Sequence, residues 1–360
     1  MYLGRRGLGR YTLELARALR SFQAQPATFV LSEQNEMIKG IEANAPHLLK
    51  LPTFAHPASP AAVANFLRAR EALLGFLECT RPAAVVNLMP HVWTPLLRPG
   101  IQRLGIRFVT TIHDARGHPG DVRGYLTRWI NSEAQLADGI VTLSRAVAEK
   151  LIAFDAVPRA KIKALFHPDI HYGPLQAKRQ RDPRAPLRLL LFGRISKYKG
   201  PGLLVQAIEL LRAEGIRVHL GVAGAGDIRS ELSRLRKLGA DVRNRWLADS
   251  EIQPLLAEYD AIVLPYIEAS QSGVLAAAYG NCMPVIGTPV GALPEQILHE
   301  RTGLVADAVT PRALANTIRR LADDPALYEH MSAHLAATRE TRSMTRFANA
   351  IVAEVQRQLQ

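Results

Sequence analysis

Two basic residues that could bind a phosphate group follow an apolar segment in the second half of the chain. Leu187–Phe192 is typical of a buried strand, and Gly193, Arg194 and Lys199 come soon after it. Arginine offers a bidentate guanidinium and lysine a mobile ammonium, and both suit a diphosphate. Basic loop residues are also often only solvated. Gly224 lies in another strand-to-helix loop, where a glycine is a weaker sign of ligand binding.

A second loop whose residues could bind a ligand follows the apolar segment Ala261–Tyr266. A helix that begins in this loop would leave three amides unpaired at its N-terminus, those of Ser272, Gly273 and Val274. Such amides bind anions. Glu268, at the start of the loop, could accept hydrogen bonds from sugar hydroxyl groups. Ser272 could equally be an ordinary helix cap.

In the first half, the predicted strand Ile106–Ile112 ends in His113 and Asp114. A histidine beside a carboxylate at a strand's carboxyl end can orient a substrate or relay protons. A lone histidine can also be a hydrogen-bonded structural residue. His118 and Asp121 lie just beyond, but the spacing matches no strong metal-ligand motif, so no metal site is predicted.

These loops must be positioned by alternating strands and helices, which predict an α/β fold with parallel, doubly wound sheets. Ligands of such sheets bind at the carboxyl ends of the strands. The polar, proline-bearing stretch 173–186 is typical of a linker. We therefore expect a first domain over residues 1–175, a second over 187–343, and a final helix over 344–360 that packs back on the first domain.

The start of the chain departs from the usual pattern. Only Met1–Leu3 precede the glycine-rich segment Gly4–Gly9, whereas a strand usually has about five or six residues. We expect the first strand to be missing, with the true start lying upstream. The sheet would then keep an unfilled slot that exposes neighbours such as Val85 or Val109.

Composition narrows the class of protein further. The chain has 360 residues, a formal net charge of +13 and two cysteines, which cannot form a disulfide framework. No apolar run has the roughly 18 residues of a membrane span, and no signal peptide is evident. The sequence predicts a cytoplasmic protein. Its basic residues are dispersed and its aromatic content is 6%, which argues against nucleic acid as the partner.

Together these residues resemble the retaining GT-B glycosyltransferases of family 4, the type found in bacterial polysaccharide and lipopolysaccharide synthesis. The resemblance spans nearly the whole chain. Its motifs are Gly193-Arg194 with Lys199-Gly200, the Glu268–Leu275 loop, Pro284–Ile286, Gly291–Glu295, Thr302–Leu304, Gly7–Tyr11, His113-Asp114 and Ala137–Ser144. The resemblance implies two Rossmann-like domains facing a cleft, and transfer of a hexose from a nucleotide diphosphate sugar without a metal ion or other cofactor.

The resemblance also implies roles for individual residues. Arg194 and Lys199 match the pair that holds the donor diphosphate. Glu268 matches the first glutamate of the family's E-x7-E element, which contacts the transferred sugar. The chain departs from the family where Ala276 replaces the second glutamate, and where Arg6 replaces the first glycine of a Gly-Gly loop.

In this interpretation, His113, Asp114 and Glu268 act in catalysis. Gly224, Ser272, Gly273 and Val274 join Arg194 and Lys199 in donor binding, and Gly7 and Gly9 lie near the phosphate or the acceptor. The acceptor would be a glycan or a lipid-linked acceptor, with the enzyme held on the anionic inner face of the cytoplasmic membrane by Arg5, Arg6, Arg10 and Arg17. Two alternatives stay open: a nucleotide-sugar isomerase or epimerase of the same fold, and an inactive nucleotide-sugar-binding scaffold.

Overall fold

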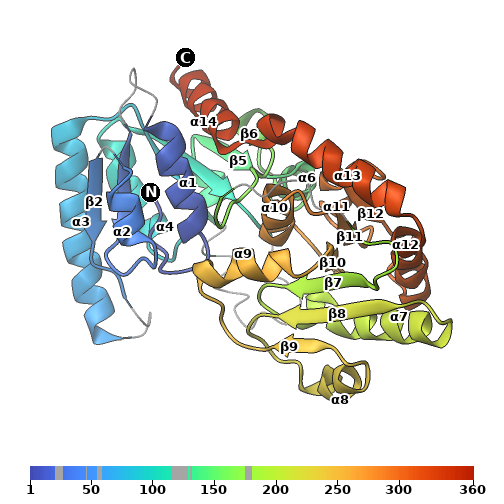
Figure 1. The fold of residues 1–360 in the computed structure, drawn as a ribbon. Coiled ribbons are helices and arrows are strands. Elements are labelled where there is room, and N and C mark those ends of the chain that lie inside the picture. The colour runs from blue at the N-terminus through green and yellow to red at the C-terminus, as the bar shows by residue number, and fades with distance from the viewer. Residues whose placement is uncertain (21–26, 46, 55–58, 116–128, 130–131, 175–180) are drawn as a thin grey trace. The chain divides into compact units, whose positions relative to one another are not determined.

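The computed structural model describes residues 1–20, 27–45, 47–54, 59–115, 129, 132–174 and 181–360. Within these ranges the chain forms two compact units, each built on parallel strands with flanking helices (Figure 1). Unit 1 takes the described residues up to Phe166 together with Met344–Gln360. Unit 2 takes His167–Ser343.

The sheet of unit 2 has six parallel strands. In sheet order they are β12 (Gly303–Val305), β11 (Val285–Gly287), β10 (Ala261–Leu264), β7 (Leu187–Phe192), β8 (Val218–Ala223) and β9 (Asp241–Arg243). The chain runs outward from β7 through β8 to β9, and then returns to place β10 on the other side of β7. The strand order therefore reverses between β7 and β10, where open α/β sheets bind their ligands.

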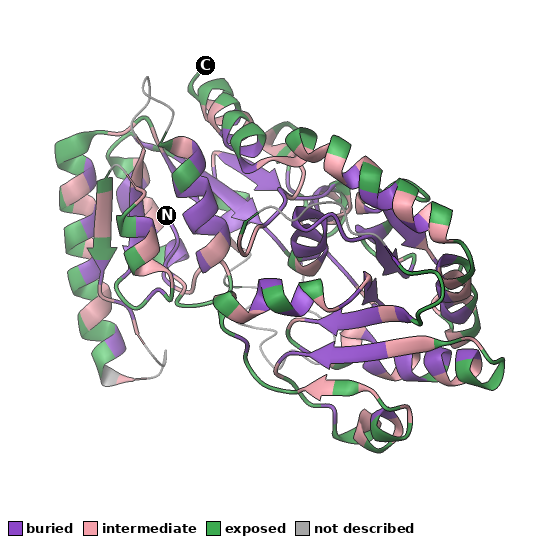
Figure 2. Cartoon of the chain, in the orientation of Figure 1, coloured by how far each residue is buried: buried purple, intermediate pink, exposed green. Residues whose placement is uncertain are grey.

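Alternation along the strands explains why helices cover both faces of this sheet. Leu189 and Leu191 of β7 pack on the face covered by α7 (Pro201–Ala213), α8 (Arg229–Lys237) and α12 (Pro311–Asp323). Leu190 and Phe192 pack on the opposite face, under α9 (Asp249–Ala257), α10 (Gly273–Gly280) and α11 (Leu293–Gln296). Figure 2 shows the resulting buried layer through the sheet. A near-continuous apolar strand is what a two-sided burial requires.

Unit 1 also has parallel strands. These are β1 (Thr28–Ser32) paired with β2 (His47–Leu51), and, in sheet order, β3 (Ala84–Asn87), β4 (Arg107–Ile112), β5 (Gly139–Thr142) and β6 (Ile162–Ala164). Its helices are α1 (Gly9–Leu19), α2 (Ile38–Glu42), α3 (Pro60–Thr80), α4 (Thr94–Arg103), α6 (Arg145–Asp155) and α14 (Met344–Leu359). Helix α14 joins this unit through Phe347, whose ring lies 5.7 Å from that of Tyr11 on α1. Among the described residues, no helix has the length and apolar character needed to cross a membrane.

The first three residues occupy the position between β1 and β3. The Tyr2 amide donates to Val30 O at 2.9 Å, and the Leu88 amide donates to Met1 O at 2.8 Å. Val85 is 8% exposed and Val109 is fully buried. The expectation that an unfilled slot exposes these two valines is therefore wrong. The reason is that Met1 and Tyr2 already hydrogen-bond to the chain at β3 and β1, and the side chains of Met1 and Leu3 join the core.

The chain enters unit 2 at His167, not in the stretch 173–186 that the sequence suggested as the linker. The reason is that residues just after His167 already bind unit 2. The Asp169 amide donates to Arg342 O at 2.9 Å, and the Ile170 amide donates to Ala276 O at 3.1 Å. Arg342 immediately precedes the point where the chain leaves this unit, so its entry and its exit lie side by side.

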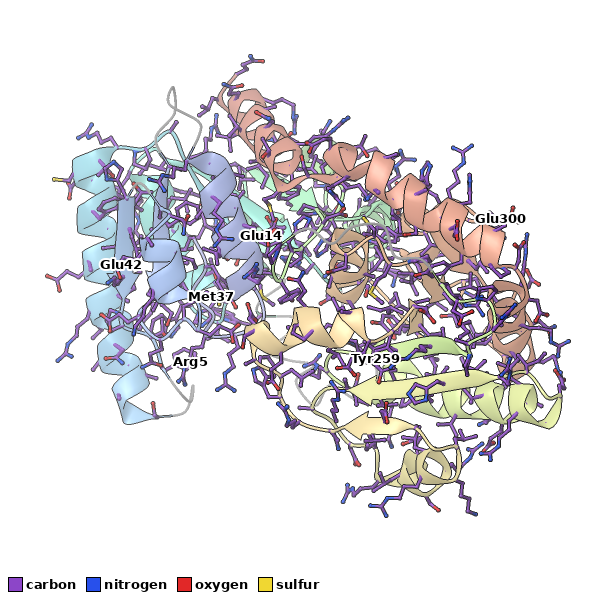
Figure 3. All side chains as sticks on the ribbon, viewed as in Figure 1. Arg5, Glu14, Met37, Glu42, Tyr259 and Glu300 are labelled. Atoms are coloured by element: carbon purple, nitrogen blue, oxygen red, sulfur yellow. The ribbon has the colours of Figure 1, made fainter. Side chains whose placement is uncertain are left out.

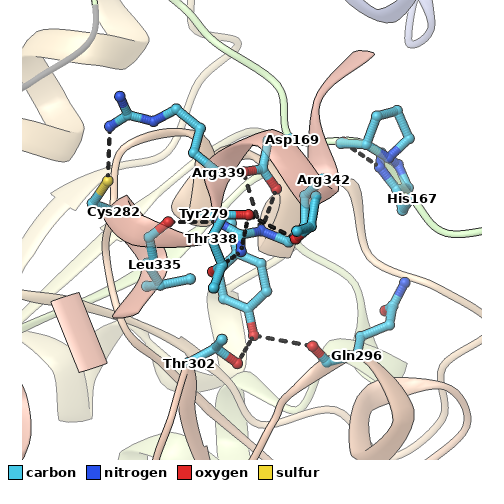
Figure 4. A network of polar contacts seen from close by, with 12 residues as sticks. His167, Asp169, Tyr279, Cys282, Gln296, Thr302, Leu335, Thr338, Arg339 and Arg342 are labelled. Carbon is cyan, nitrogen blue, oxygen red and sulfur yellow. Dashed lines mark hydrogen bonds and ion pairs between the residues drawn. The ribbon is translucent and has the colours of Figure 1, made fainter. Parts of the chain in front are cut away.

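An ion pair reinforces this junction (Figure 4). Arg342 Nε lies 3.1 and 3.2 Å from the two carboxylate oxygens of Asp169, and the other nitrogens of the guanidinium donate to Thr338 and Leu335. The guanidinium carbon also lies 5.4 Å from the centre of the Tyr279 ring. Burial raises the pKa of Asp169 to about 6, although the Arg342 charge acts in the opposite direction.

This pKa predicts how Asp169→Asn changes the pH dependence of stability. Because the folded pKa of about 6 exceeds the ordinary value of 3.8, the folded state favours the protonated carboxyl. The protonated carboxyl therefore stabilises the folded state fully below pH 3.8, and this stabilisation is lost as the pH rises through 6. Between pH 4 and pH 7 the free energy of unfolding of the wild type should therefore fall relative to the variant, by up to about 3 kcal/mol. Denaturant unfolding at several pH values measures this.

The exposed Asp307→Asn variant is the control and should follow the wild-type profile. Parallel profiles for the wild type and Asp169→Asn would contradict the raised pKa.

Candidate active site

The loops after β7 and β10 lie next to each other, because these strands are neighbours at the reversal of strand order. The first loop runs from Gly193 to Gly200 and contains a short 3-10 turn, Lys197–Lys199. The second runs from Pro265 to Ser272 and leads into α10. The structure thus brings the two sequence-predicted donor loops together at one edge of the unit 2 sheet.

Lys199 points its ammonium toward the beginning of α10. A Cβ built on Gly193 would lie 3.6 Å from Lys199 Nζ and 2.9 Å from Val274 Cγ2, so these atoms surround one point. Burial lowers the pKa of Lys199, and the nearby charge of Arg194 acts in the same direction. In the described part of the chain, neither cation has a hydrogen bond or an ion pair. Two like charges without a counterion are a favourable place for an anion.

The N-terminus of α10 supplies further donors. The Ser272 side chain accepts from the Leu275 amide at 3.3 Å, so this serine caps the helix. This cap satisfies only one of the amides at the start of the helix. Across the described ranges, no acceptor is present for the amides of Ser272, Gly273 and Val274. These amides and the two cations form a positively polarised surface.

Glu268 lies in the same loop, half-buried, on the way from β10 to α10. Ala276, by contrast, is 1% exposed inside α10, and its carbonyl accepts from the Ile170 amide. A methyl group in that position offers no acceptor to a ribose. The contact that the family makes with a second glutamate has no counterpart at this residue.

Gly224 lies in close contact with the first loop, after β8. A Cβ at this position would lie 1.9 Å from Gly193 O, and the residue has a φ of +142°. The Gly193 amide meanwhile donates to Ala223 O at 3.0 Å, and the Ile195 amide donates to Ala225 O at 2.9 Å. The loop after β7 is therefore paired, backbone to backbone, with the loop after β8. Gly224 contributes to the site by allowing this approach, and its contact with a donor stays a prediction.

In unit 1, His113 follows β4 and is 6% exposed. Its Nε2 lies 2.8 Å from Leu88 O, and because a carbonyl can only accept, Nε2 carries the proton. Burial lowers the pKa of this imidazole, so the ring is neutral near pH 7 and Nδ1 is left as an acceptor. Asp114 beside it is exposed. His118 and Asp121 lie outside the described residues.

The glycine-rich segment of unit 1 is already engaged by a carboxylate that the sequence did not indicate. The Gly7 amide donates to Glu36 Oε1 at 3.1 Å. Gly9 begins α1, and a Cβ there would lie 2.8 Å from Met37 Cγ (Met37 is labelled in Figure 3). An anion at this helix end would compete with Glu36. Within the described ranges, no group of three or more histidine, cysteine, aspartate or glutamate side chains could hold a metal ion.

The two units define the GT-B glycosyltransferase fold. HepE of Anabaena, solved in complex with UDP and glucose, superposes with a TM-score of 0.73 over 99% of this chain and 98% of its own. The two sequences are 14% identical, so this likeness concerns the fold alone.

Two family models identify the group of proteins within that fold. The model described as Glycosyltransferase Family 4 matches residues 5–167, and the model described as Glycosyl transferases group 1 matches residues 186–324. Together they cover most of both units. The chain belongs to the family 4 type of glycosyltransferases, as its motifs indicated.

Curated relatives match in part. A D-inositol 3-phosphate glycosyltransferase of Pseudarthrobacter chlorophenolicus is 31% identical over 44% of this chain and 40% of its own length. A glycogen synthase of Mycobacterium tuberculosis is 29% identical over 66% of this chain and 60% of its own length. The chain thus spans about half the length of these relatives.

Gly224→Ala tests how strongly the site depends on the approach of the two loops. Gly239→Ala is the matched control, because Gly239 also has a positive φ of +70° but has nothing within 4 Å of its Cβ position. Both variants carry backbone strain, which is greater at the φ of +142° than at +70°, and only the first adds a clash with a backbone carbonyl. Gly224→Ala should lose about 1–3 kcal/mol more unfolding free energy than the control. Equal losses in denaturant unfolding would mean that the loops adjust freely.

Proposed function

We propose that the protein is a retaining glycosyltransferase that moves a hexose from a nucleotide diphosphate sugar to a glycan or lipid-linked acceptor. The observation that carries this proposal is the pair of uncompensated cations, Arg194 and Lys199, beside the unpaired amides that begin α10. A diphosphate has the charge and the acceptor oxygens to satisfy all of these groups. The named relatives transfer or polymerise sugars, which supports this class of reaction.

The chemistry follows from where charge develops. When the bond from the anomeric carbon to the diphosphate breaks, negative charge accumulates on the leaving oxygen. Lys199 and the amides of α10 are already oriented before reaction, and together with Arg194 they stabilise that charge. These cations can do what a divalent cation does in other transferases, and we propose that turnover continues in EDTA.

Each unit has its own role in this proposal. Glu268 accepts hydrogen bonds from the transferred sugar at the donor loop of unit 2. In unit 1, His113 is neutral, and its Nδ1 accepts a hydrogen bond from the transferred sugar or from the hydroxyl group that receives it. Asp114 lies beside it. The complexes of HepE with UDP and with UDP-glucose make UDP-glucose the first donor to test.

Lys199→Ala and Glu268→Gln should separate phosphate binding from sugar transfer. Loss of the ammonium should weaken UDP binding and lower turnover, by on the order of 10²-fold in kcat/KM. Glu268→Gln should lower turnover while the Kd of UDP stays within about twofold. Calorimetric binding of UDP and a transfer assay measure both quantities, with GDP, ADP and dTDP sugars tested in parallel.

Release of free nucleotide with an enlarged glycan supports transfer. An epimerised donor would instead identify an isomerase, and absence of binding to any nucleotide would identify an inactive scaffold. Equal losses of UDP binding in the two variants would contradict the division of roles.

We also propose that basic residues near α1 hold the protein on the anionic inner face of the cytoplasmic membrane, where a lipid-linked acceptor lies. Arg5, Arg6 and Arg17 are exposed. Arg10 contributes less, because it forms an ion pair with Glu14 at 3.2 Å. Exposed cations near an anionic surface contribute about 1 kcal/mol each.

Sedimentation with anionic vesicles measures this attraction. Arg5→Glu with Arg17→Glu should weaken binding, whereas Arg236→Glu with Lys237→Glu on α8 makes the same charge change in unit 2 and should not. Binding should fall as salt rises above 0.1 M, where the screening length is about 10 Å. Binding that survives high salt, or that falls equally in both double variants, would oppose the proposed surface.

A further inference from the structure

Tyr266 lies between the two donor loops and has no role in the function proposed above. It follows β10, and its side chain is 3% exposed. Its ring centre lies 5.5 Å from Lys199 Nζ, and its hydroxyl oxygen lies 3.3 Å from Ser272 Oγ. One side chain therefore touches both the cation and the residue that caps α10.

The backbone around Tyr266 fixes the position of its ring. The Thr288 hydroxyl donates to Tyr266 O at 2.5 Å. The Ile267 amide donates to Tyr198 O at 2.7 Å, which joins the two loops directly. Gly200, with a φ of +68°, lets them come closer still, because a Cβ there would lie 1.8 Å from Pro265 O. The ring of Tyr198 also packs against that of Tyr266, edge to face at 6.4 Å.

An aromatic ring is suited to this position for an electrostatic reason. The face of the ring attracts an ammonium through its quadrupole, and this attraction strengthens as water is excluded. A carboxylate in the same place would hold the ammonium more strongly, but it would also neutralise the charge that an incoming anion needs. No described carboxylate pairs with Lys199, and the ring leaves its net positive charge intact.

We propose that Tyr266 is a positioning residue, which holds the Lys199 ammonium beside the N-terminus of α10 so that it meets the donor diphosphate. This inference rests on the proposed function, because it assigns the group that orients one of the diphosphate ligands. Its effect acts through Lys199, so it disappears when Lys199 is removed.

Two variants of Tyr266 separate the ring from the hydroxyl, and a double variant tests the dependence on Lys199, with UDP affinity measured by calorimetry. Tyr266→Phe keeps the ring, and its Kd should stay within about twofold of the wild type. Tyr266→Met fills similar space without a ring face and should weaken UDP binding about tenfold. In a Lys199→Ala background the same change to Met should have less than a twofold effect, because the two residues act as one unit.

Phenylalanine analogues with increasing fluorination, introduced at position 266, keep the shape of the ring and weaken its negative face. UDP affinity should decline stepwise along this series, which a purely structural role would not produce. The series also decides the question if Tyr266→Met fails to fold.

Tyr259→Leu is the matched control. Tyr259 (labelled in Figure 3) is also a buried tyrosine with a cation over its ring, since Arg188 lies 5.4 Å from the ring centre. It precedes β10, whereas Tyr266 follows this strand. This variant should lose stability and keep its UDP affinity.

The proposal is overturned if Tyr266→Met weakens binding equally with and without Lys199, if Tyr266→Phe behaves like Tyr266→Met, or if the fluorinated series is flat. A wild type that binds no nucleotide would overturn the proposed function, and this inference with it. Loss of binding in Lys199→Ala together with normal binding in Tyr266→Met would overturn the inference alone.

Discussion

Contact between backbones at the carboxyl edge of the unit 2 sheet is the constraint on which the candidate site depends. The loop after β7 is held on one side by the loop after β8, where Gly224 lies under Gly193 O. On its other side it meets the loop after β10, through the bond from the Ile267 amide to Tyr198 O. These contacts leave the loop little freedom, so Lys199 is directed by the main chain and not only by its own flexible side chain. A preorganised cation costs no reorientation when charge develops.

Much of this architecture could be predicted from residue patterns. The strand Leu187–Phe192 has the bounds that the sequence predicts, because a buried parallel strand is a continuous apolar run with clear turn residues beside it. Unit 1 was harder. Helix α4 contains Pro95 and Pro99, which favour a loop interpretation, and β2 has exposed residues that hide its strand character. Neither element was predicted, because tertiary packing outweighs weak local preference there.

The residues of the site also divide into those that local patterns indicate and those that only the tertiary structure brings together. Arg194, Lys199 and Ser272 could be found because each follows a strand and precedes a helix, and this position can be read locally. The neighbourhood of Tyr266 and Lys199 could not, since it depends on the reversal of strand order that places β10 beside β7. Glu36 binds the Gly7 amide across 29 positions of sequence, and nothing in its local pattern indicates that contact. Long-range pairs of this kind require the topology first.

The adjacent entry and exit of unit 2 have a topological consequence. Phe166 and Met344 both belong to unit 1, so unit 2 is a domain inserted into the chain of another. Because Asp169 N and Arg342 O lie 2.9 Å apart, the inserted segment begins and ends at one place, as a closed loop does. Another domain whose ends are adjacent can replace such a segment during evolution, because it would fit between the same two points of the host chain. A unit connected in this way can diversify independently of the unit that carries it.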